Sequence, residues 1–151
     1  MSLMAGAAPQ GRSAPDCAVD RLPSSEAWLA AAAHHGELFA QLDLGVRIAL
    51  LARAAPTQML VWEVGIRGID VRIEPFADYA TSGADIVLAA DDESLIAVRS
   101  GDARRLFEVL RSSVRSGHIV CYMLKRRCVL EERGLEDMLD ALGFAFMGAC
   151  R

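Results

Sequence analysis

Residues 57–75, TQMLVWEVGIRGIDVRIEP, contain two runs in which apolar side chains recur at every second position. The repeating apolar residues are Leu60, Trp62 and Val64 in the first run, and Ile69, Val71 and Ile73 in the second. Because successive side chains of a strand point to opposite faces, this pattern predicts two β-strands, with residues 65–68 as the turn of a hairpin. Charged residues alternate with the apolar ones in the second run, so we expect that strand to be half exposed.

Three further segments carry strand patterns. Residues 45–56, GVRIALLARAAP, alternate until Pro56 stops the run. Residues 84–90, ADIVLAA, are too continuously apolar to have a wet face, so we expect this strand inside the sheet. Residues 118–124, HIVCYML, predict a fifth strand, followed by a charged turn or edge at residues 125–127.

Helical periodicity occupies most of the remaining chain. A first helix begins at an N-cap supplied by Ser24 or Ser25, and Gly36 is a possible break in it. The run ARRLFEVLRSSVRS after Asp102 has one apolar face and ends at Gly117. Residues 134–143, GLEDMLDALG, predict the final helix. The sequence therefore predicts an α+β fold.

The stretch AADDESLIAVRSGDARRLF, residues 89–107, concentrates acidic residues. These could form a catalytic cluster, or they could begin two helices. Asp91 and Asp102 occupy N-cap positions, and Asp92 and Glu93 fall in a first turn, where a negative charge meets the positive end of the helix dipole. We favour helix capping over chemistry for this group.

The length of 151 residues suits one domain. Residues 1–23 are rich in Ala, Gly, Pro and Ser and are predicted to be a flexible tail, which leaves residues 24–151 as a single domain. An apolar fraction of 53% with 24% charged residues indicates a soluble folded protein. The net charge of −4, without a basic stripe, argues against nucleic acid as a partner. No apolar stretch is long enough for a membrane span.

The cysteine and histidine positions do not have the spacing of a metal site, so we predict no metal and no cofactor. The N-terminal residues lack the apolar core of a signal peptide, which favours a reducing cytoplasm. The sequence also shows no Ser-His-Asp order, glycine-rich phosphate loop or carboxylate pair outside a capping position, so we expect a protein that is not an enzyme.

The order of elements resembles the sterol carrier protein type 2 family of small lipid-binding domains. The resemblance lies between about residues 58 and 142, in three pieces: QMLVWEVGIRGIDVRIEP, ADIVLAADDESLIAVRSGDARRLF and SGHIV. It implies a mainly antiparallel five-stranded sheet covered by helices, with a tunnel for fatty acyl chains, acyl-CoA or sterol-like molecules. Bacterial relatives in that family include accessory proteins of isoprenoid quinone synthesis. The segment CYMLKRRCVLEERG departs from the family pattern after the fifth strand.

A lipid tunnel requires apolar side chains that surround empty space and a few polar groups at the mouth. The candidate ligand-binding residues are Trp62, Phe107, Leu110, Val114, Met123, Met138, Leu142 and Phe146. Each has an alternative as ordinary core, because cores are filled by these same residue types. Arg126 and Arg127 are candidates for holding an anionic head group, with a solvated strand edge as the alternative.

Three other residues have a chemical and a structural interpretation. His118 could titrate near neutral pH, or be an exposed histidine without a role. Cys121 and Cys128 flank a basic segment that could lower a thiol pKa, although burial as small apolar residues is the favoured interpretation.

The leading hypothesis is intracellular binding or transfer of a hydrophobic ligand (fatty acyl, acyl-CoA, sterol-like or isoprenoid) by a non-enzymatic cytoplasmic protein. The alternative is an interaction or accessory subunit, for example of isoprenoid quinone synthesis, in which the apolar residues 144–150 dock on a partner or form a homodimer. An enzyme, or an accessory domain of an enzyme that for instance presents quinone precursors, is the third possibility.

Overall fold

The computed structural model describes residues 21–144 and contains one five-stranded sheet with helices. Two helices, α3 (Ser25–His34) and α4 (Gly36–Ala40), precede β1 (Arg47–Ala52), β2 (Gln58–Gly65), β3 (Gly68–Pro75) and β4 (Ile86–Ala90). Next come α5 (Asp92–Ser100), the short 3-10 helix η1 (Ala103–Arg105), α6 (Leu106–Arg115) and β5 (Ile119–Met123). The last two elements are α7 (Arg127–Glu132) and α8 (Glu136–Ala141).

The strands follow the order β3-β2-β1-β4-β5 across the sheet. β1 and β4 run parallel, and the other three pairs of neighbours are antiparallel. The predicted α+β class and the mainly antiparallel five-stranded sheet are therefore confirmed. The crossover between the two parallel strands contains the β2–β3 hairpin, so β1 is the central strand while β3 and β5 form the edges.

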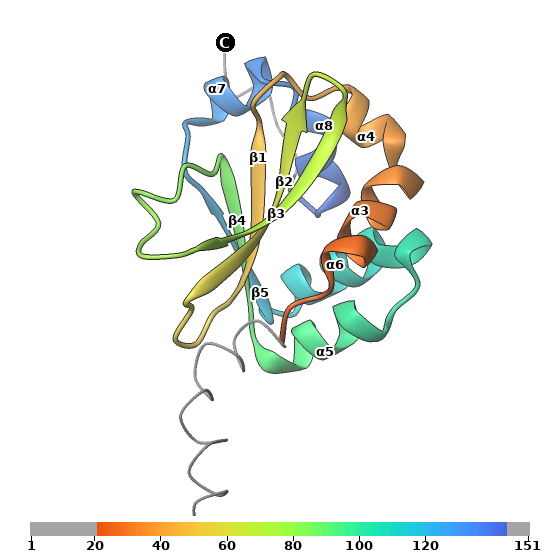
Figure 1. Ribbon diagram of the computed structural model, residues 1–151, viewed down its shortest axis with the longest axis vertical. Helices are drawn as coiled ribbons and strands as arrows, with labels where there is room; N and C mark the ends of the chain where they lie inside the picture. Colours follow the sequence, from red (N-terminus) through yellow and green to blue (C-terminus); the bar gives the residue numbers. More distant parts are fainter. Residues whose placement is uncertain (1–20, 145–151) are drawn as a thin grey trace, which may run out of the picture.

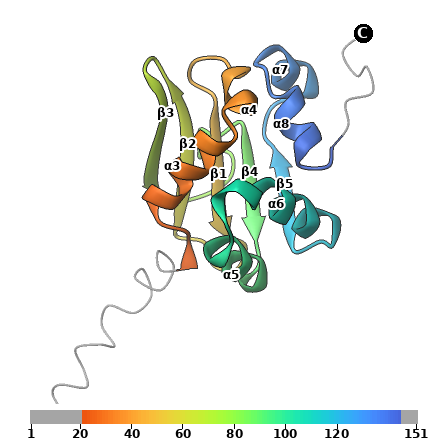
Figure 2. The ribbon, with the colours of Figure 1, turned by 90° about the vertical axis from the view of Figure 1, so that its right-hand side faces the viewer.

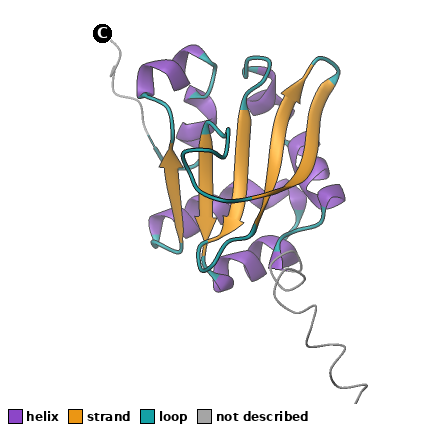
Figure 3. Cartoon of the chain, turned by 60° about the vertical axis from the view of Figure 1, so that its left-hand side comes forward, coloured by secondary structure: helices purple, strands orange, loops and turns teal. Residues whose placement is uncertain are grey.

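The two faces of the sheet are covered differently. Helices cover one face, while the loop between β3 and β4 crosses the other (Figures 1 and 3). The helix-covered face carries the large core, to which Ile48, Leu60 and Leu88 contribute from the strands. The loop-covered face buries a smaller apolar cluster that includes Leu51, Val61 and Val87. This alternation along each strand is the period of two expected from the sequence.

An aromatic stack fills the centre of the large core. Trp28 of α3 lies parallel to Trp62 of β2, with ring centroids 4.0 Å apart, and Phe107 of α6 stacks on the other side at 6.2 Å from Trp62. The Trp62 indole Nε1 donates to the backbone oxygen of Trp28 at 2.7 Å. Leu22, from the segment predicted to be a flexible tail, is also buried in this core.

A buried carboxylate joins the strands at one end of the sheet. Asp85 precedes β4 and is 2% exposed. Its side chain accepts from the backbone N–H of Arg47 at 2.8 Å and forms an ion pair with the Arg133 guanidinium at 3.2 Å. Its backbone oxygen accepts from Leu124 at 2.9 Å. One residue thus connects β1, β4, the end of β5 and the segment after α7.

Helix α7 corrects the prediction for the charged segment after β5. Residues 125–127 were expected to form a turn or strand edge, but Arg127 begins a helix and Arg126 is its N-cap residue. The helix is short and its N-cap makes no side-chain hydrogen bond, so local capping signals do not mark it. Burial of Leu130 in the large core holds it in place.

The turn after α7 requires glycine. Gly134 has φ of +84°, and a Cβ added there would lie 1.9 Å from the backbone oxygen of Gln41. The neighbouring Arg133 oxygen accepts from the backbone N–H of Asp43 at 3.0 Å. The backbone of this turn therefore packs directly on the segment between α4 and β1, at a distance that no side chain permits.

The predicted caps are confirmed. Asp91 caps α5 by accepting from the backbone N–H of Ser94 at 2.9 Å, and Asp102 accepts from Arg104 at 2.9 Å at the start of η1. The break expected at Gly36 is also present, since α4 begins there. Within residues 21–144, no helix is long and apolar enough to cross a membrane.

We predict that Asp85→Ala lowers the free energy of unfolding by about 3 kcal/mol, because it leaves a buried backbone N–H and a partly buried guanidinium without their acceptor. Urea unfolding followed by far-UV circular dichroism measures the change. The matched control is Asp140→Ala on α8, an exposed aspartate that we expect to change stability by less than about 0.5 kcal/mol. Equal stability of the two variants would contradict the role of Asp85.

Candidate functional site

An apolar groove of about 570 Å³ lies between the helix pair α3–α4 and the turn of the β2–β3 hairpin. Its volume is within the range of small-molecule pockets. Helix α3 lies alongside the hairpin in Figures 1 and 2, with α4 near the hairpin turn. The lining residues are Leu29, Ala32, Ala33, Gly36, Phe39, Ala40, Leu42, Val64, Gly65, Ile66, Arg67, Gly68 and Ile69.

Small residues on the helices create this space. Ala32 and Ala33 line the groove from α3, and Gly36 lines it at the start of α4, where an added Cβ would meet no atom within 4 Å. Buried Phe39 closes the inner side and packs edge-to-face on Trp62, with ring centroids 4.9 Å apart. The groove therefore ends against the filled core and does not continue through it at this point.

The rim of the groove combines exposed apolar side chains with one charge. Ile66 in the hairpin turn is 91% exposed, and Leu29 on α3 is 46% exposed. Among the described residues, Arg67 is the one charged residue that lines the groove. Exposed apolar groups around a concave surface are typical of ligand grooves and of interaction surfaces.

The predicted ligand-binding residues lie elsewhere. Trp62, Phe107, Leu110, Met138 and Leu142 are buried in the large core, and the half-buried Val114 and Met123 pack against it. Phe146 lies outside the described residues. The structure brings these described residues together as packed core, and none of them lines the groove. Their contact with a ligand remains a prediction.

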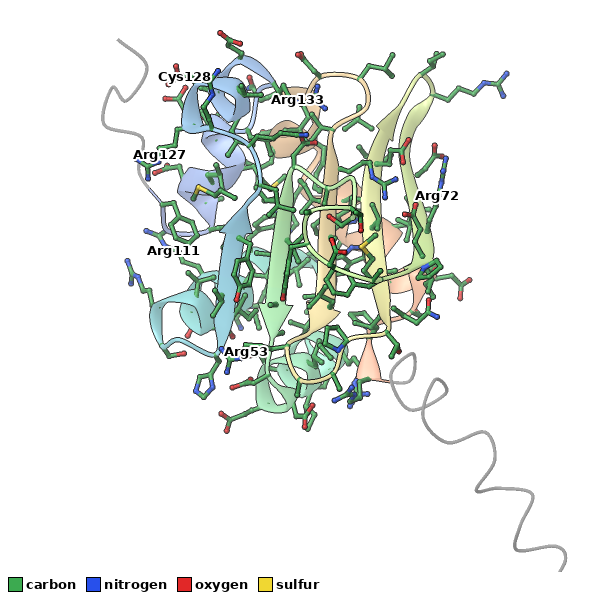
Figure 4. All side chains as sticks on the ribbon, turned by 90° about the vertical axis from the view of Figure 1, so that its left-hand side faces the viewer. Arg53, Arg72, Arg111, Arg127, Cys128 and Arg133 are labelled. Atoms are coloured by element: carbon green, nitrogen blue, oxygen red, sulfur yellow. The ribbon has the colours of Figure 1, made fainter. Side chains whose placement is uncertain are left out.

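The predicted head-group residues are also remote from the groove lining. Arg126 and Arg127 stand at the start of α7. In Figure 4, Arg127 lies on the opposite flank of the sheet from Arg72 of β3, the strand that forms the hairpin beside the groove. Their role with an anionic group therefore remains a prediction, and Arg67 is the cation that the groove itself provides.

Two sequence signals for the groove were present. The run of four alanines at residues 30–33, followed by Gly36, leaves a helix surface without large side chains. Ile66 is an apolar residue in a two-residue hairpin turn, a position where polar residues and glycine are favoured. Neither signal indicates that the two segments face each other, because that depends on how α3 packs across the sheet.

The acidic stretch at the start of α5 forms a compact charged cluster with the start of β5. His118 Nδ1 lies 2.5 Å from Asp91 Oδ2, and its Nε2 lies 3.3 Å from Glu93 Oε1. The backbone N–H of Asp91 donates to the His118 oxygen at 2.9 Å. These side chains lie within 4.8 Å of one another, close enough for metal ligands. Asp91 is already engaged as a helix cap, so a structural role accounts for the arrangement.

The hydrogen bond between His118 and Asp91 shifts the pKa of both side chains. The bond from His118 lowers the pKa of Asp91 to about 2, and the bond to Asp91 raises the pKa of His118 above 6.5. His118 is thus an ion-pair partner of the α5 cap, and the prediction of a histidine without a role is replaced.

The cysteines show no activated thiol among the described residues. Burial raises the pKa of Cys121 to about 12, which agrees with its interpretation as a small apolar residue. Cys128 on α7 is disulfide-bonded, whereas the sequence favoured a reduced side chain.

No family model and no curated protein matches this chain. Among solved structures, the chain is similar to a protein described as "UbiJ-SCP2 Ubiquinone synthesis protein". The similarity has a TM-score of 0.36 and 19% identity, and covers 74% of this chain and 77% of that one.

The His118–Asp91 pair contributes most to stability in mildly acidic solution. The raised pKa of His118 adds stability below 6.5 that is lost as pH rises through the folded-state value. The lowered pKa of Asp91 adds stability above 3.8 that is lost as pH falls toward about 2.

We therefore expect His118→Gln to remove part of the loss of stability on the alkaline side. Urea unfolding between about pH 5 and about pH 9 measures this slope. The exposed His34 on α3 provides the control variant His34→Gln, which should keep the wild-type slope. Parallel slopes for wild type and His118→Gln would contradict the ion pair.

Proposed function

We propose that this protein binds a hydrophobic small molecule, of the fatty acyl, acyl-CoA, sterol-like or isoprenoid kind, and that the groove between α3–α4 and the hairpin turn holds it. The observation that carries the proposal is an apolar concave surface of about 570 Å³ next to strongly exposed apolar side chains. Burial of each ligand methylene contributes roughly 0.8 kcal/mol, so a short hydrocarbon segment already provides useful affinity.

Arg67 gives the proposed site a polar end. Arg67 is an exposed residue of a lining that is otherwise uncharged, and arginine offers paired donors to a carboxylate or phosphate. A ligand with an apolar body and an acidic head would satisfy both parts of the groove. The role first assigned to Arg126 and Arg127 thus has a second candidate beside the apolar surface.

The proposed mechanism is partition without chemistry. The groove is accessible from the surface, so a hydrocarbon can enter and leave while the Trp28–Trp62–Phe107 stack stays intact. A ligand at the interior residues Phe107, Leu110 and Met138 would require the helices to separate from the sheet, since these side chains are packed against their neighbours. The groove is therefore the favoured location.

An accessory role remains the alternative proposal. The residues predicted to dock on a partner, 144–150, lie almost entirely outside the described part of the chain. The exposed Ile66 and Leu29 offer a second apolar surface for that purpose. A chain that presents a bound hydrophobic molecule to a partner enzyme would use both properties, and quinone precursors are one class of such molecules.

We predict that Gly36→Trp reduces affinity for a fluorescent fatty acid about tenfold. The added indole occupies the space where a Cβ meets no atom within 4 Å, and excluding two methylenes costs roughly 1.6 kcal/mol of binding free energy. Fluorescence titration of the delipidated protein measures the dissociation constant.

The control is Ile96→Trp, which adds an indole to an exposed position of α5 away from the groove and should leave the affinity unchanged. Wild-type protein that takes up no apolar probe would contradict the proposed function. Binding that is equally tight in Gly36→Trp would instead contradict the groove and favour the interior residues.

A further inference from the structure

Among residues 21–144, β3 forms one edge of the sheet, and its backbone groups pair with β2 alone. Figure 2 shows β3 as the outermost strand. An edge strand of eight residues offers unpaired N–H and C=O groups to another strand, unless its side chains prevent it. Two properties determine which strand can pair with this edge. The first is which residues direct their backbone N–H and C=O groups outward, and the second is which side chains lie beside them.

Hydrogen bonds at the ends of the hairpin fix the backbone directions. Phe76 N–H donates to Thr57 at 3.0 Å, so even-numbered residues of this arm bond toward β2. The Val64 N–H and C=O both bond toward β1, so odd-numbered residues of β2 bond toward β3, which agrees with this assignment. Ile69, Val71 and Ile73 therefore direct their backbone groups away from the sheet. Pro75, which has no N–H, occupies the next outward position.

The side chains divide between the two faces of the strand. Ile69, Val71 and Ile73 lie on the helix-covered face, opposite Val64, Trp62 and Leu60 of β2, and Ile73 remains 42% exposed. Asp70, Arg72 and Glu74 lie on the other face.

Most of the charge on that face is already compensated within the chain. Arg47 bonds both Glu63, at 2.6 Å, and Glu74, at 2.5 Å. In contrast, the ion pairs of Arg72 are long, at 3.8 Å to Glu63 and 3.9 Å to Asp70, and the side chains of Arg72 and Asp70 are 53% and 58% exposed. Asp70 and Arg72 can therefore form shorter ion pairs with a partner.

We propose that β3 pairs with β3 of a second copy of this chain, antiparallel and centred on Val71, to form a continuous ten-stranded sheet. In this register the outward residues meet each other: Ile69 faces Ile73 of the other copy, and the two copies of Val71 face one another. Asp70 then faces Arg72 of the other copy, twice by symmetry, as a non-hydrogen-bonded pair with closely spaced side chains.

The charges select this register against its neighbours. Centring on Asp70 would place two aspartates opposite each other, and centring on Arg72 would place two arginines opposite each other. Like charges directly opposite are destabilising. Moving the centre further toward the C-terminal end brings Pro75 into the ladder and loses a hydrogen bond. The charges of Asp70 and Arg72 thus disfavour pairing of this edge with other strands, and they favour pairing with a second copy of the chain.

Charge-reversal variants of the full chain test the proposal. Asp70→Arg gives a chain with arginine at both facing positions, and Arg72→Asp gives one with aspartate at both. Each variant alone should dimerise at least about tenfold more weakly than wild type, whereas an equimolar mixture should recover wild-type association as a heterodimer. Analytical ultracentrifugation from roughly 1 µM to 1 mM chain measures the dissociation constants, and circular dichroism verifies folding.

The mixture keeps the test decisive if one substitution lowers stability, because recovered association requires both chains to be folded. A wild-type protein that is monomeric over the whole range would overturn the proposal. So would a wild-type dimer that both single variants retain, since the contact would then lie on another surface. The ligand assay with Gly36→Trp is independent of these outcomes.

Discussion

The buried carboxylate of Asp85 is the interaction on which the arrangement of this sheet depends. The parallel pairing of β1 and β4 places the beginnings of these two strands side by side, and Asp85, which directly precedes β4, accepts from the backbone of β1. Its ion pair with Arg133 brings in the turn after α7, and its backbone bonds the end of β5. This buried charge is tolerated because it is paired and hydrogen-bonded. Since its partners come from different parts of the chain, the pairing forms only when folding brings those parts together.

The packing of the core determines where the protein has space for a ligand. Three aromatic rings in parallel occupy the middle of the layer between sheet and helices, and close packing there leaves little room without rearrangement. Alanine and glycine on α3 and α4 leave the adjacent surface hollow. The large aromatic side chains thus fill the interior, whereas the small side chains of α3 and α4 leave a groove on the surface next to the hairpin. This division moves the most favourable location for a hydrocarbon from the interior to that surface.

The sequence predicted features that depend on neighbouring residues and failed on those that depend on packing. Alternation identified four of the strands and a continuous apolar run identified β4, and the caps at Asp91 and Asp102 were confirmed, because each signal requires only a few consecutive residues. Helix α7 was not predicted, since burial of Leu130 and the close approach of Gly134 to Gln41 stabilise it from outside the segment. The groove was missed for the same reason: Ala33 and Ile66 become neighbours only through the angle at which α3 crosses the hairpin.

The stacked indoles have a spectroscopic consequence. The chain contains two tryptophans, and both belong to the one pair at 4.0 Å with an interplanar angle of 5°. Fluorescence excited selectively in tryptophan therefore originates from a single point of the native protein, where α3 meets β2. This tryptophan fluorescence therefore reports how α3 packs on the sheet, without an added label. Signals from the α7–α8 end of the molecule would remain invisible by the same measurement, so partial unfolding at that end requires a separate probe.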